Sequence, residues 1–253
     1  MIGVYFSGTG NTKYCVEYVV PRLGGGGACA IESDGAIAAV QSSDEIVFAY
    51  PVQFSNVPKI VRDFIVSNAG LWRGKKIFVI ATMGLFSGDG AGCSARLFKK
   101  YGAEILGGLH LKMPDCIGDV KLLKKPLDEN RTIIAEAEHK MAAAIRGIKG
   151  GAYPKDGLHF FCRIAGLFGQ RLYFGGKTKR YYTKIRTDES KCVKCGLCVS
   201  LCPMANIKIE DRVIYQNKCT MCYRCFAHCP KQAITILGTR VYEQCRFESY
   251  KGQ

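Results

Sequence analysis

The architecture of the first domain follows from one run near the start of the chain, Ile2-Gly3-Val4-Tyr5-Phe6-Ser7-Gly8-Thr9-Gly10-Asn11-Thr12. Residues 2–6 are apolar, and the run is too short for anything but a buried strand. Apolar residues at helical spacing follow from about 11 to 22. Residues 7–12 therefore join a strand to a helix N-terminus, where backbone N–H groups can surround a phosphate.

This loop lacks the lysine of a triphosphate-binding loop and the G-x-G-x-x-G of a dinucleotide-binding loop. A mononucleotide phosphate therefore fits it best. The alternative is a turn that merely caps the helix, for which Ser7 or Thr9 would suffice. Four hydroxyl or amide side chains in six residues exceed what a cap needs.

Strands and helices are expected to alternate through the first 150 residues. Further strands fit residues 28–32, 45–50, 76–81 and 104–111, and further helices fit residues 57–67, 91–101 and 127–148. Strands that alternate with helices predict a parallel sheet covered on both faces. The predicted fold class is α/β, with a doubly wound five-stranded parallel sheet over residues 1–150.

The loop at residues 7–12 resembles the phosphate loop of flavodoxins, and the alternation over residues 1–148 supports that family. The resemblance implies FMN at the carboxyl ends of the strands, between the first and third. Three loops would bind it: Ser7, Gly8, Thr9, Gly10, Asn11 and Thr12; then Pro51, Val52, Gln53 and Phe54; then Thr82, Met83, Gly84, Leu85, Phe86 and Gly88. For the last two, plain glycine- and proline-rich turns are the alternative.

The domain departs from many flavodoxins in two respects. It is not acidic, and its third loop offers only Phe86 as an aromatic ring, which predicts a more open flavin face.

Eight cysteines form two copies of the pattern C-x2-C-x2-C-x3-C-P, 27 residues apart. The copies are Cys192, Cys195, Cys198 and Cys202, then Cys219, Cys222, Cys225 and Cys229, followed by Pro203 and Pro230. In two-cluster 4Fe-4S proteins the fourth cysteine of each run ligates the other cluster. Cys229 is therefore expected to complete the first set and Cys202 the second. Two zinc sites are the alternative, but zinc ligands usually come as two separated pairs.

This region resembles bacterial two-cluster ferredoxins over about residues 185–238. We expect residues 185–253 to form a small α+β ferredoxin-like domain with a C-terminal tail. A fold this small has little core of its own, so removal of iron should unfold it.

Residues 151–184 form a basic, aromatic connector between the two domains. We expect a helix that packs on one domain and presents Arg163, Arg171, Lys177 and Lys179 to water. Docking on a membrane surface is the alternative.

The formal charge of +15 counts every cysteine as a neutral thiol. Eight thiolates, two cluster cores and an FMN phosphate would lower it to about +9. The remaining charge favours acidic partners, such as a redox protein with an acidic surface, or anionic surfaces. No nucleic-acid motif stands out, and no run of about 18 apolar residues predicts a membrane span. The start lacks the pattern of a secretory signal, so a cytoplasmic location is expected; the oligomeric state is left open.

Six further cysteines lie outside the two runs: Cys15, Cys29, Cys93, Cys116, Cys162 and Cys245. Each is expected to be a small buried hydrophobe. Cys93 near a helix N-terminus is the candidate for reactivity. His228, beside Cys229, is a surface histidine or a hydrogen-bond donor to a cluster. No serine, histidine and acid constellation stands out, so no catalytic residue is assigned.

Nearly the whole chain resembles the flavodoxin-ferredoxin fusion proteins of anaerobic bacteria. The resemblance implies electron transfer between FMN and two 4Fe-4S clusters, linking a low-potential donor to a redox partner. The alternative is a flavin-dependent reductase of a small organic acceptor, fed by the clusters. The donor, the acceptor and the direction of electron flow do not follow from the sequence.

Overall fold

The computed structural model describes residues 1–168, 172 and 183–251. A five-stranded sheet forms the centre of the first domain, with strands in the order β2-β1-β3-β4-β5 and every pair parallel. The strands are β1 (Ile2–Tyr5), β2 (Ala28–Ala30), β3 (Glu45–Pro51), β4 (Lys76–Met83) and β5 (Glu104–Lys112). This order has its switch point between β1 and β3, as the flavodoxin-like fold requires.

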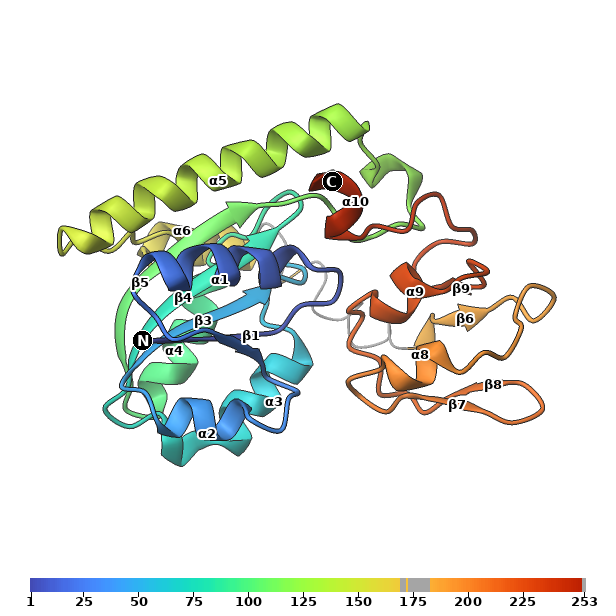
Figure 1. The fold of residues 1–253 in the computed structure, drawn as a ribbon, viewed down its shortest axis with the longest axis horizontal. Coiled ribbons are helices and arrows are strands. Elements are labelled where there is room, and N and C mark those ends of the chain that lie inside the picture. Colours follow the sequence, from blue (N-terminus) through green and yellow to red (C-terminus); the bar gives the residue numbers. More distant parts are fainter. Residues whose placement is uncertain (169–171, 173–182, 252–253) are drawn as a thin grey trace.

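Helices cover both faces of the sheet (Figure 1). One face carries α1 (Asn11–Arg22) and α5 (Leu127–Lys149), and the other carries α2 (Ala36–Gln41), α3 (Lys59–Ser67) and α4 (Gly90–Lys100). Short 3-10 turns, η1 (Ala69–Leu71) and η2 (Lys121–Leu123), interrupt two of the connections. The expected helices are present, and α2 is an additional one that the sequence pattern did not indicate.

Two apolar cores result from the alternation of side chains along the buried strands. In β3, Val47 and Ala49 face the core under α1 and α5, whereas Phe48 and Tyr50 face the core under α3 and α4. The second core also contains Trp72, whose ring meets Phe48 edge-on. Both faces of the sheet are therefore closed, and the ends of the strands remain for a binding site.

The start of the expected connector belongs to the first domain. The N–H of Gly108 in β5 donates to the carbonyl oxygen of Pro154 (2.8 Å), and the N–H of Asp156 donates back to that of Gly108 (2.9 Å). Residues 154–156 thus pair with the open edge of β5. Helix α6 (Phe160–Gly166) follows, with Arg163 exposed as expected. Arg171, Lys177 and Lys179 lie outside the described residues.

The C-terminal domain consists of two short antiparallel strand pairs and two short helices. The pairs are β6 (Arg186–Thr187) with β9 (Ile234–Thr235), and β7 (Ile207–Ile209) with β8 (Val213–Tyr215); the helices are α8 (Leu197–Ser200) and α9 (Arg224–His228). Figure 1 shows this domain facing the carboxyl ends of the parallel strands.

The tail returns to the first domain instead of staying with the C-terminal one. Helix α10 (Phe247–Lys251) packs beside α1 and α5 (Figure 1). The N–H of Phe247 donates to the carbonyl oxygen of Thr9 (2.9 Å), and its ring stacks on Tyr14 with 4.3 Å between ring centroids. Tyr250 is buried in the core under α1 and α5. The chain therefore runs from the first domain to the C-terminal domain and then returns to the first domain.

The carboxylate of Asp119, in the loop after β5, joins the two domains. Its Oδ2 accepts hydrogen bonds from the N–H groups of Ile236, Leu237 and Gly238 (2.6, 2.8 and 3.0 Å). Its Oδ1 accepts one from the hydroxyl of Tyr223 (2.9 Å). Asp119 is only 2% exposed, so water does not compete for these bonds.

Replacement of Asp119 by Ala should destabilise the C-terminal domain. Each buried donor left without an acceptor costs about 1–3 kcal/mol, so we expect the free energy of unfolding to fall by about 3 kcal/mol or more. Anaerobic denaturant unfolding followed by circular dichroism measures the change. Asp34→Ala, at an exposed turn, is the control and should leave the unfolding midpoint unchanged. Equal midpoints for the two variants would contradict the role given to Asp119.

Candidate functional site

A cavity of about 280 Å³ opens at the carboxyl ends of the strands, and we call it the strand-end cavity. Three loops expected from the sequence line it, through Ser7, Gly8, Thr9, Asn11, Thr12, Pro51, Val52, Gln53, Phe54, Thr82, Met83, Gly84, Leu85 and Phe86. The loops after β1, β3 and β4 meet here because parallel strands end at the same edge of the sheet.

The loop after β1 has the properties of an anion site. Helix α1 begins at Asn11 without a side-chain cap and without an acidic residue in its first turn. The first N–H groups of such a helix have no partner inside the helix and carry partial positive charge. In addition, Oδ1 of Asn11 is buried without a hydrogen-bond partner, while its amide nitrogen donates to the carbonyl oxygen of Pro114 (2.8 Å). The loop therefore fits a phosphate held by these groups.

Two of the residues expected to bind the cofactor lie outside the cavity lining. Gly10 adopts a φ of 98°, and a side chain there would collide with Phe247 of α10. Gly88 adopts a φ of 56° and lies against Gly166 of α6, with no room for a side chain. At both positions, the absence of a side chain allows another segment to pack closely, α10 at Gly10 and α6 at Gly88.

The cavity also contains residues that the sequence did not indicate. The loop after β5 contributes Met113, Pro114, Asp115, Cys116 and Ile117, and Leu123 follows. No motif marks this loop, although the fifth strand of such a sheet also ends at the cofactor edge. Asp115 lies so close to Gly84 that a side chain at Gly84 would collide with its carboxylate. Burial raises the pKa of the Asp115 carboxyl. The N–H of Ile117 donates to this carboxyl (2.8 Å), which lowers the pKa and partly offsets the effect of burial.

The eight cysteines of the repeated pattern line two cavities, four in each. The distal cysteine cavity contains Cys192, Cys195, Cys198 and Cys229, and the proximal cysteine cavity contains Cys202, Cys219, Cys222 and Cys225. The fourth cysteine of each run thus joins the first three of the other. Isoleucines such as Ile209 and Ile234 line the distal cavity, and Ile207 and Ile236 line the proximal one.

The largest electrostatic neighbours of Cys198 and Cys225 follow the same division. Burial raises the pKa of Cys198, and the thiols of Cys192, Cys195 and Cys229 raise it further. Burial also raises the pKa of Cys225, with added contributions from Cys222, Cys219 and Cys202 in that order and a smaller one from Cys198 of the other set. Such groups are bound as thiolates only where a cation compensates their charge.

Backbone N–H groups point at sulfur in both halves. The N–H of Asn206 donates to Sγ of Cys202, and the N–H of Ala233 donates to Sγ of Cys229, each at 3.3 Å. In the described ranges, no three His, Cys, Asp or Glu side chains are arranged around a single ion. A 4Fe-4S cluster binds its thiolates through four different iron atoms, so its ligands lie farther apart than those of one ion. The residues present fit such a cluster in each cavity.

The duplication is also visible in the backbone. Left-handed φ values occur at Lys194 and Met221, at Gly196 and Tyr223, and at Ala205 and Gln232. Members of each pair lie 27 residues apart, the spacing of the cysteine repeat. Tyr223 is unusual because a buried, bulky residue occupies a conformation that favours glycine.

The proximal cysteine cavity borders the strand-end cavity directly. Cys222 and Tyr223 line both, and Met221 lines the strand-end cavity beside them. The amide nitrogen of Gln53 donates to the carbonyl oxygens of Thr220 (2.8 Å) and Met221 (3.2 Å).

Arg224 and Gly8 complete this contact. The guanidinium of Arg224 donates to the carbonyl oxygen of Ser7 (2.7 Å) and forms an ion pair with Glu32. Gly8 has no room for a side chain because the carbonyl of Cys222 lies against it. The loop of the expected phosphate site and the loop of the proximal cysteines are therefore in van der Waals contact.

The remaining cysteines and His228 differ in their surroundings. Cys15 and Cys245 are buried, as expected, whereas Cys29, Cys93, Cys116 and Cys162 are partly exposed. Sγ of Cys93 lies 3.4 Å from a guanidinium nitrogen of Arg96 and 3.7 Å from Oδ1 of Asp89. Nδ1 of His228 lies 3.0 Å from the carbonyl oxygen of Arg224, so this hydrogen bond is directed at the backbone of α9.

Comparison with known proteins identifies the C-terminal domain. Residues 184–230 match the 4Fe-4S dicluster domain family. This part of the chain is an iron–sulfur domain. The match favours clusters over the zinc alternative. We call residues 184–238, which contain the matched residues 184–230, the dicluster domain from here on. No curated protein matches the chain.

Solved structures similar to the chain include several flavodoxins. Two-electron reduced Megasphaera elsdenii flavodoxin is 25% identical, with 46% of this chain and 89% of that chain covered and a TM-score of 0.41. A flavodoxin from the domain Archaea is 14% identical, with coverages of 58% and 97% and a TM-score of 0.39. A cysteine-to-serine mutant of flavodoxin from Pseudomonas aeruginosa is 18% identical, with coverages of 59% and 99% and a TM-score of 0.40.

Replacement of Cys202 by Ala tests the crossed arrangement of the cysteines. Loss of this ligand should release the cluster of the proximal cavity, although Cys202 belongs to the first run. We expect Cys219, Cys222 and Cys225 to react with iodoacetamide faster than in the wild-type protein, under anaerobic native conditions. Mass spectrometry of the digested protein identifies the alkylated residues.

Cys229→Ala is the matched control. It should expose Cys192, Cys195 and Cys198 to alkylation and leave the proximal cysteines protected. If each variant instead exposes the cysteines of its own run, the crossed arrangement is wrong.

Proposed function

We propose that the protein transfers electrons between FMN in the strand-end cavity and two 4Fe-4S clusters in the dicluster domain. The observation that carries the proposal is the position of Cys222, which lines both the strand-end cavity and the proximal cysteine cavity. A group in one cavity and a group in the other would therefore need no residue between them other than Cys222. FMN, when bound, takes up two electrons and releases them singly, and each cluster carries one.

Several residues support FMN as the occupant of the strand-end cavity. The uncapped N-terminus of α1 and the unpaired Oδ1 of Asn11 suit its phosphate. Val52, Met83 and Met113 offer apolar contacts for a flat ring system. The mononucleotide fits this loop better than a dinucleotide because the loop lacks the glycine pattern of dinucleotide sites.

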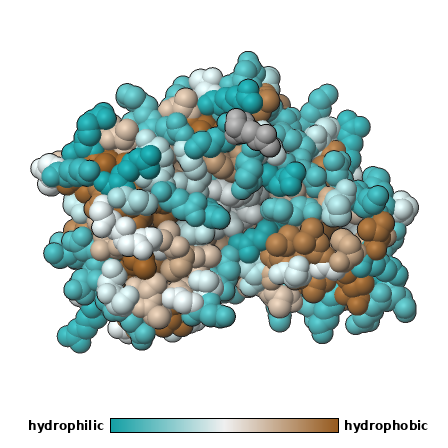
Figure 2. Space-filling model, in the orientation of Figure 1, coloured by the Kyte–Doolittle hydropathy of each residue, from teal (hydrophilic) through white to brown (hydrophobic). Residues whose placement is uncertain are grey.

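A redox partner with an acidic surface is proposed to dock at the distal cysteine cavity. Cys195 is exposed there, and Val193, Leu197 and Val199 are 57%, 39% and 38% exposed. Figure 2 shows apolar side chains gathered on the dicluster domain, at the right of the view. An apolar surface beside a shallow cluster suits transient docking and fast electron exchange.

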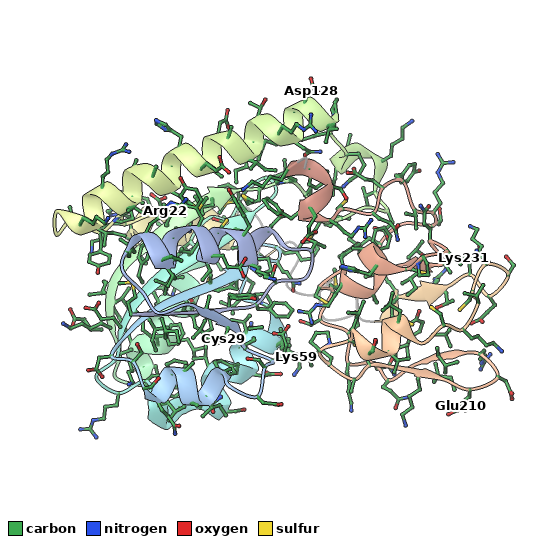
Figure 3. The ribbon with its side chains drawn as sticks, viewed as in Figure 1. Arg22, Cys29, Lys59, Asp128, Glu210 and Lys231 are labelled. Atoms are coloured by element: carbon green, nitrogen blue, oxygen red, sulfur yellow. The ribbon has the colours of Figure 1, made fainter. Side chains whose placement is uncertain are left out.

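The charge around the distal cavity supports an acidic partner. Lys194 and Lys231 line this cavity, and no Asp or Glu is among its described lining residues. Figure 3 shows Lys231 on the dicluster domain, with Glu210 at the opposite edge. Positive charge at the docking end increases the rate of encounter with an acidic surface.

Thiolate ligands need a reducing compartment, which supports our placement of the protein in the cytoplasm.

The test begins with the cofactor content and the internal electron exchange of the anaerobically purified protein. We expect about eight iron and about one FMN per chain. After rapid photoreduction of the flavin, the clusters should become reduced at a rate that does not change on tenfold dilution of the protein. A rate proportional to protein concentration, or clusters that never exchange with the flavin, would contradict the proposal.

A variant of the contact between the domains sharpens this test. Arg224→Gln removes the ion pair with Glu32 and weakens the bond to the carbonyl of Ser7. The internal rate should fall, because the two loops are then held less closely. Arg212→Gln, at an exposed position in the β7–β8 turn, should leave the rate unchanged.

A second candidate function is the reduction of a small organic acceptor at the flavin. The observation that favours it is Asp115, a partly buried carboxyl in the strand-end cavity whose pKa is raised by burial. Such a group can hold a proton at a higher pH than an ordinary carboxyl and deliver it to an acceptor. Two-electron reduction of a quinone, for example, consumes two electrons from the reduced protein and two protons.

This second function predicts a pH dependence. Turnover of quinone or nitroaromatic acceptors by the reduced protein should be highest below the pKa of Asp115 and fall as the pH rises through it, because only the protonated carboxyl donates. Asp115→Asn should lower the rate and remove this pH dependence, while Asp34→Asn should keep both. A rate no higher than that of free FMN would dismiss the reductase and leave electron transfer intact.

A further inference from the structure

Helix α6, together with Phe168 and Leu172, exposes an unusual amount of apolar surface. Phe160, Phe161 and Phe168 are 67%, 81% and 68% exposed, and Leu172 is 61% exposed. Gly166 is the buried residue of α6 and lies against Gly88. Only small parts of the helix are covered, at Gly166 and the partly buried Cys162, and its aromatic side chains project from the surface. A soluble protein rarely exposes several large apolar side chains together without a binding role.

A cationic groove of about 430 Å³ lies beside these aromatic side chains. Its basic lining residues are Arg96, Lys99, Lys155, His159 and Arg163, and Phe160 of α6 also lines it. No Asp or Glu is among the described residues that line it. Arg96 forms an ion pair with Asp89 (2.6 Å), whereas Lys99 and His159 are exposed to solvent.

We propose that α6 and this groove dock the protein on the surface of an anionic phospholipid membrane. Aromatic rings next to lysine and arginine are the combination that lies at the boundary between headgroups and acyl chains. The phenylalanines would enter that boundary, and lipid phosphates would occupy the groove. The structure contains no helix, among the residues it describes, that is long and apolar enough to cross a membrane.

Charge argues for a lipid surface over a second copy of the chain. In a twofold dimer built on α6, the cationic groove of one protomer would face that of the other. Like charges that meet in an interface oppose association. An anionic headgroup layer instead supplies the opposite charge along with an apolar layer for the phenylalanines.

The contact between α6 and Gly88 gives this docking a consequence for the strand-end cavity. Gly88 belongs to the loop after β4, whose Leu85 and Phe86 line the cavity and are 63% and 47% exposed. Docking through α6 would thus place the rim of the cavity near the membrane surface. The docking itself does not depend on the identity of the group bound in that cavity.

Vesicle flotation of the full-length, cluster-containing protein tests the proposal. We expect binding to vesicles of phosphatidylcholine with about 30% phosphatidylglycerol, weak binding to phosphatidylcholine alone, and loss of binding in high salt. Phe161→Asp combined with Phe168→Asp should weaken binding about tenfold or more, because both apolar contacts become charged. Lys99→Glu should weaken binding to the anionic vesicles alone.

Leu122→Asp is the matched control, since Leu122 is 92% exposed in η2 and lies outside α6 and the groove lining. It should bind as the wild-type protein does, and the visible absorption of each variant shows whether its clusters are intact. Equal binding to both vesicle types, or no effect of the double variant, would overturn the proposal. Sedimentation as a dimer that the double variant dissociates would assign α6 to contact between copies instead.

Discussion

The arrangement of the two domains depends on the buried carboxylate of Asp119. It originates in the loop after β5 of the sheet domain, yet its hydrogen-bond partners are Tyr223 and the backbone of residues 236–238. An ionised group in an apolar interior is tolerated only when donors surround it. The four donors fix the dicluster domain against the sheet, because moving it would leave both the charge and the N–H groups unpaired.

Tyr223 shows how this constraint reaches the functional site. It occupies the position that Gly196 holds in the first repeat, with a left-handed φ of 60° and 1% exposure. Such a conformation costs free energy for a bulky residue and persists where its surroundings determine it. Here the hydroxyl bonds to Asp119 and the ring meets Phe226 edge-on. The residue between the two cavities is thereby held in one position.

Asymmetry between the two cysteine cavities follows from this placement. The proximal one is lined by residues of the dicluster domain and adjoins the strand-end cavity through Cys222 and Tyr223, and Cys225 in it is buried. The distal one includes the exposed Cys195 and lies among exposed apolar residues and lysines. Two nearly identical cysteine runs thus acquire different environments, and such differences give chemically similar clusters different properties. One cavity adjoins the strand-end cavity, and the other lies at the surface of the dicluster domain.

The sequence by itself determined the parts of this protein that follow from local patterns. The alternation of strands and helices predicted the parallel sheet, and the spacing of eight cysteines predicted their division into two groups of four. That these groups hold clusters and that the loop at residues 7–12 binds an anion stay predictions. Only the tertiary structure showed that Asp115 lines the strand-end cavity, that α10 returns to Thr9, and that Cys222 adjoins both cavities. These contacts join residues far apart in the chain, where no local periodicity or motif records which segments meet. They result from the packing of two domains through a few buried polar groups, and a single sequence carries no separate signal for that packing.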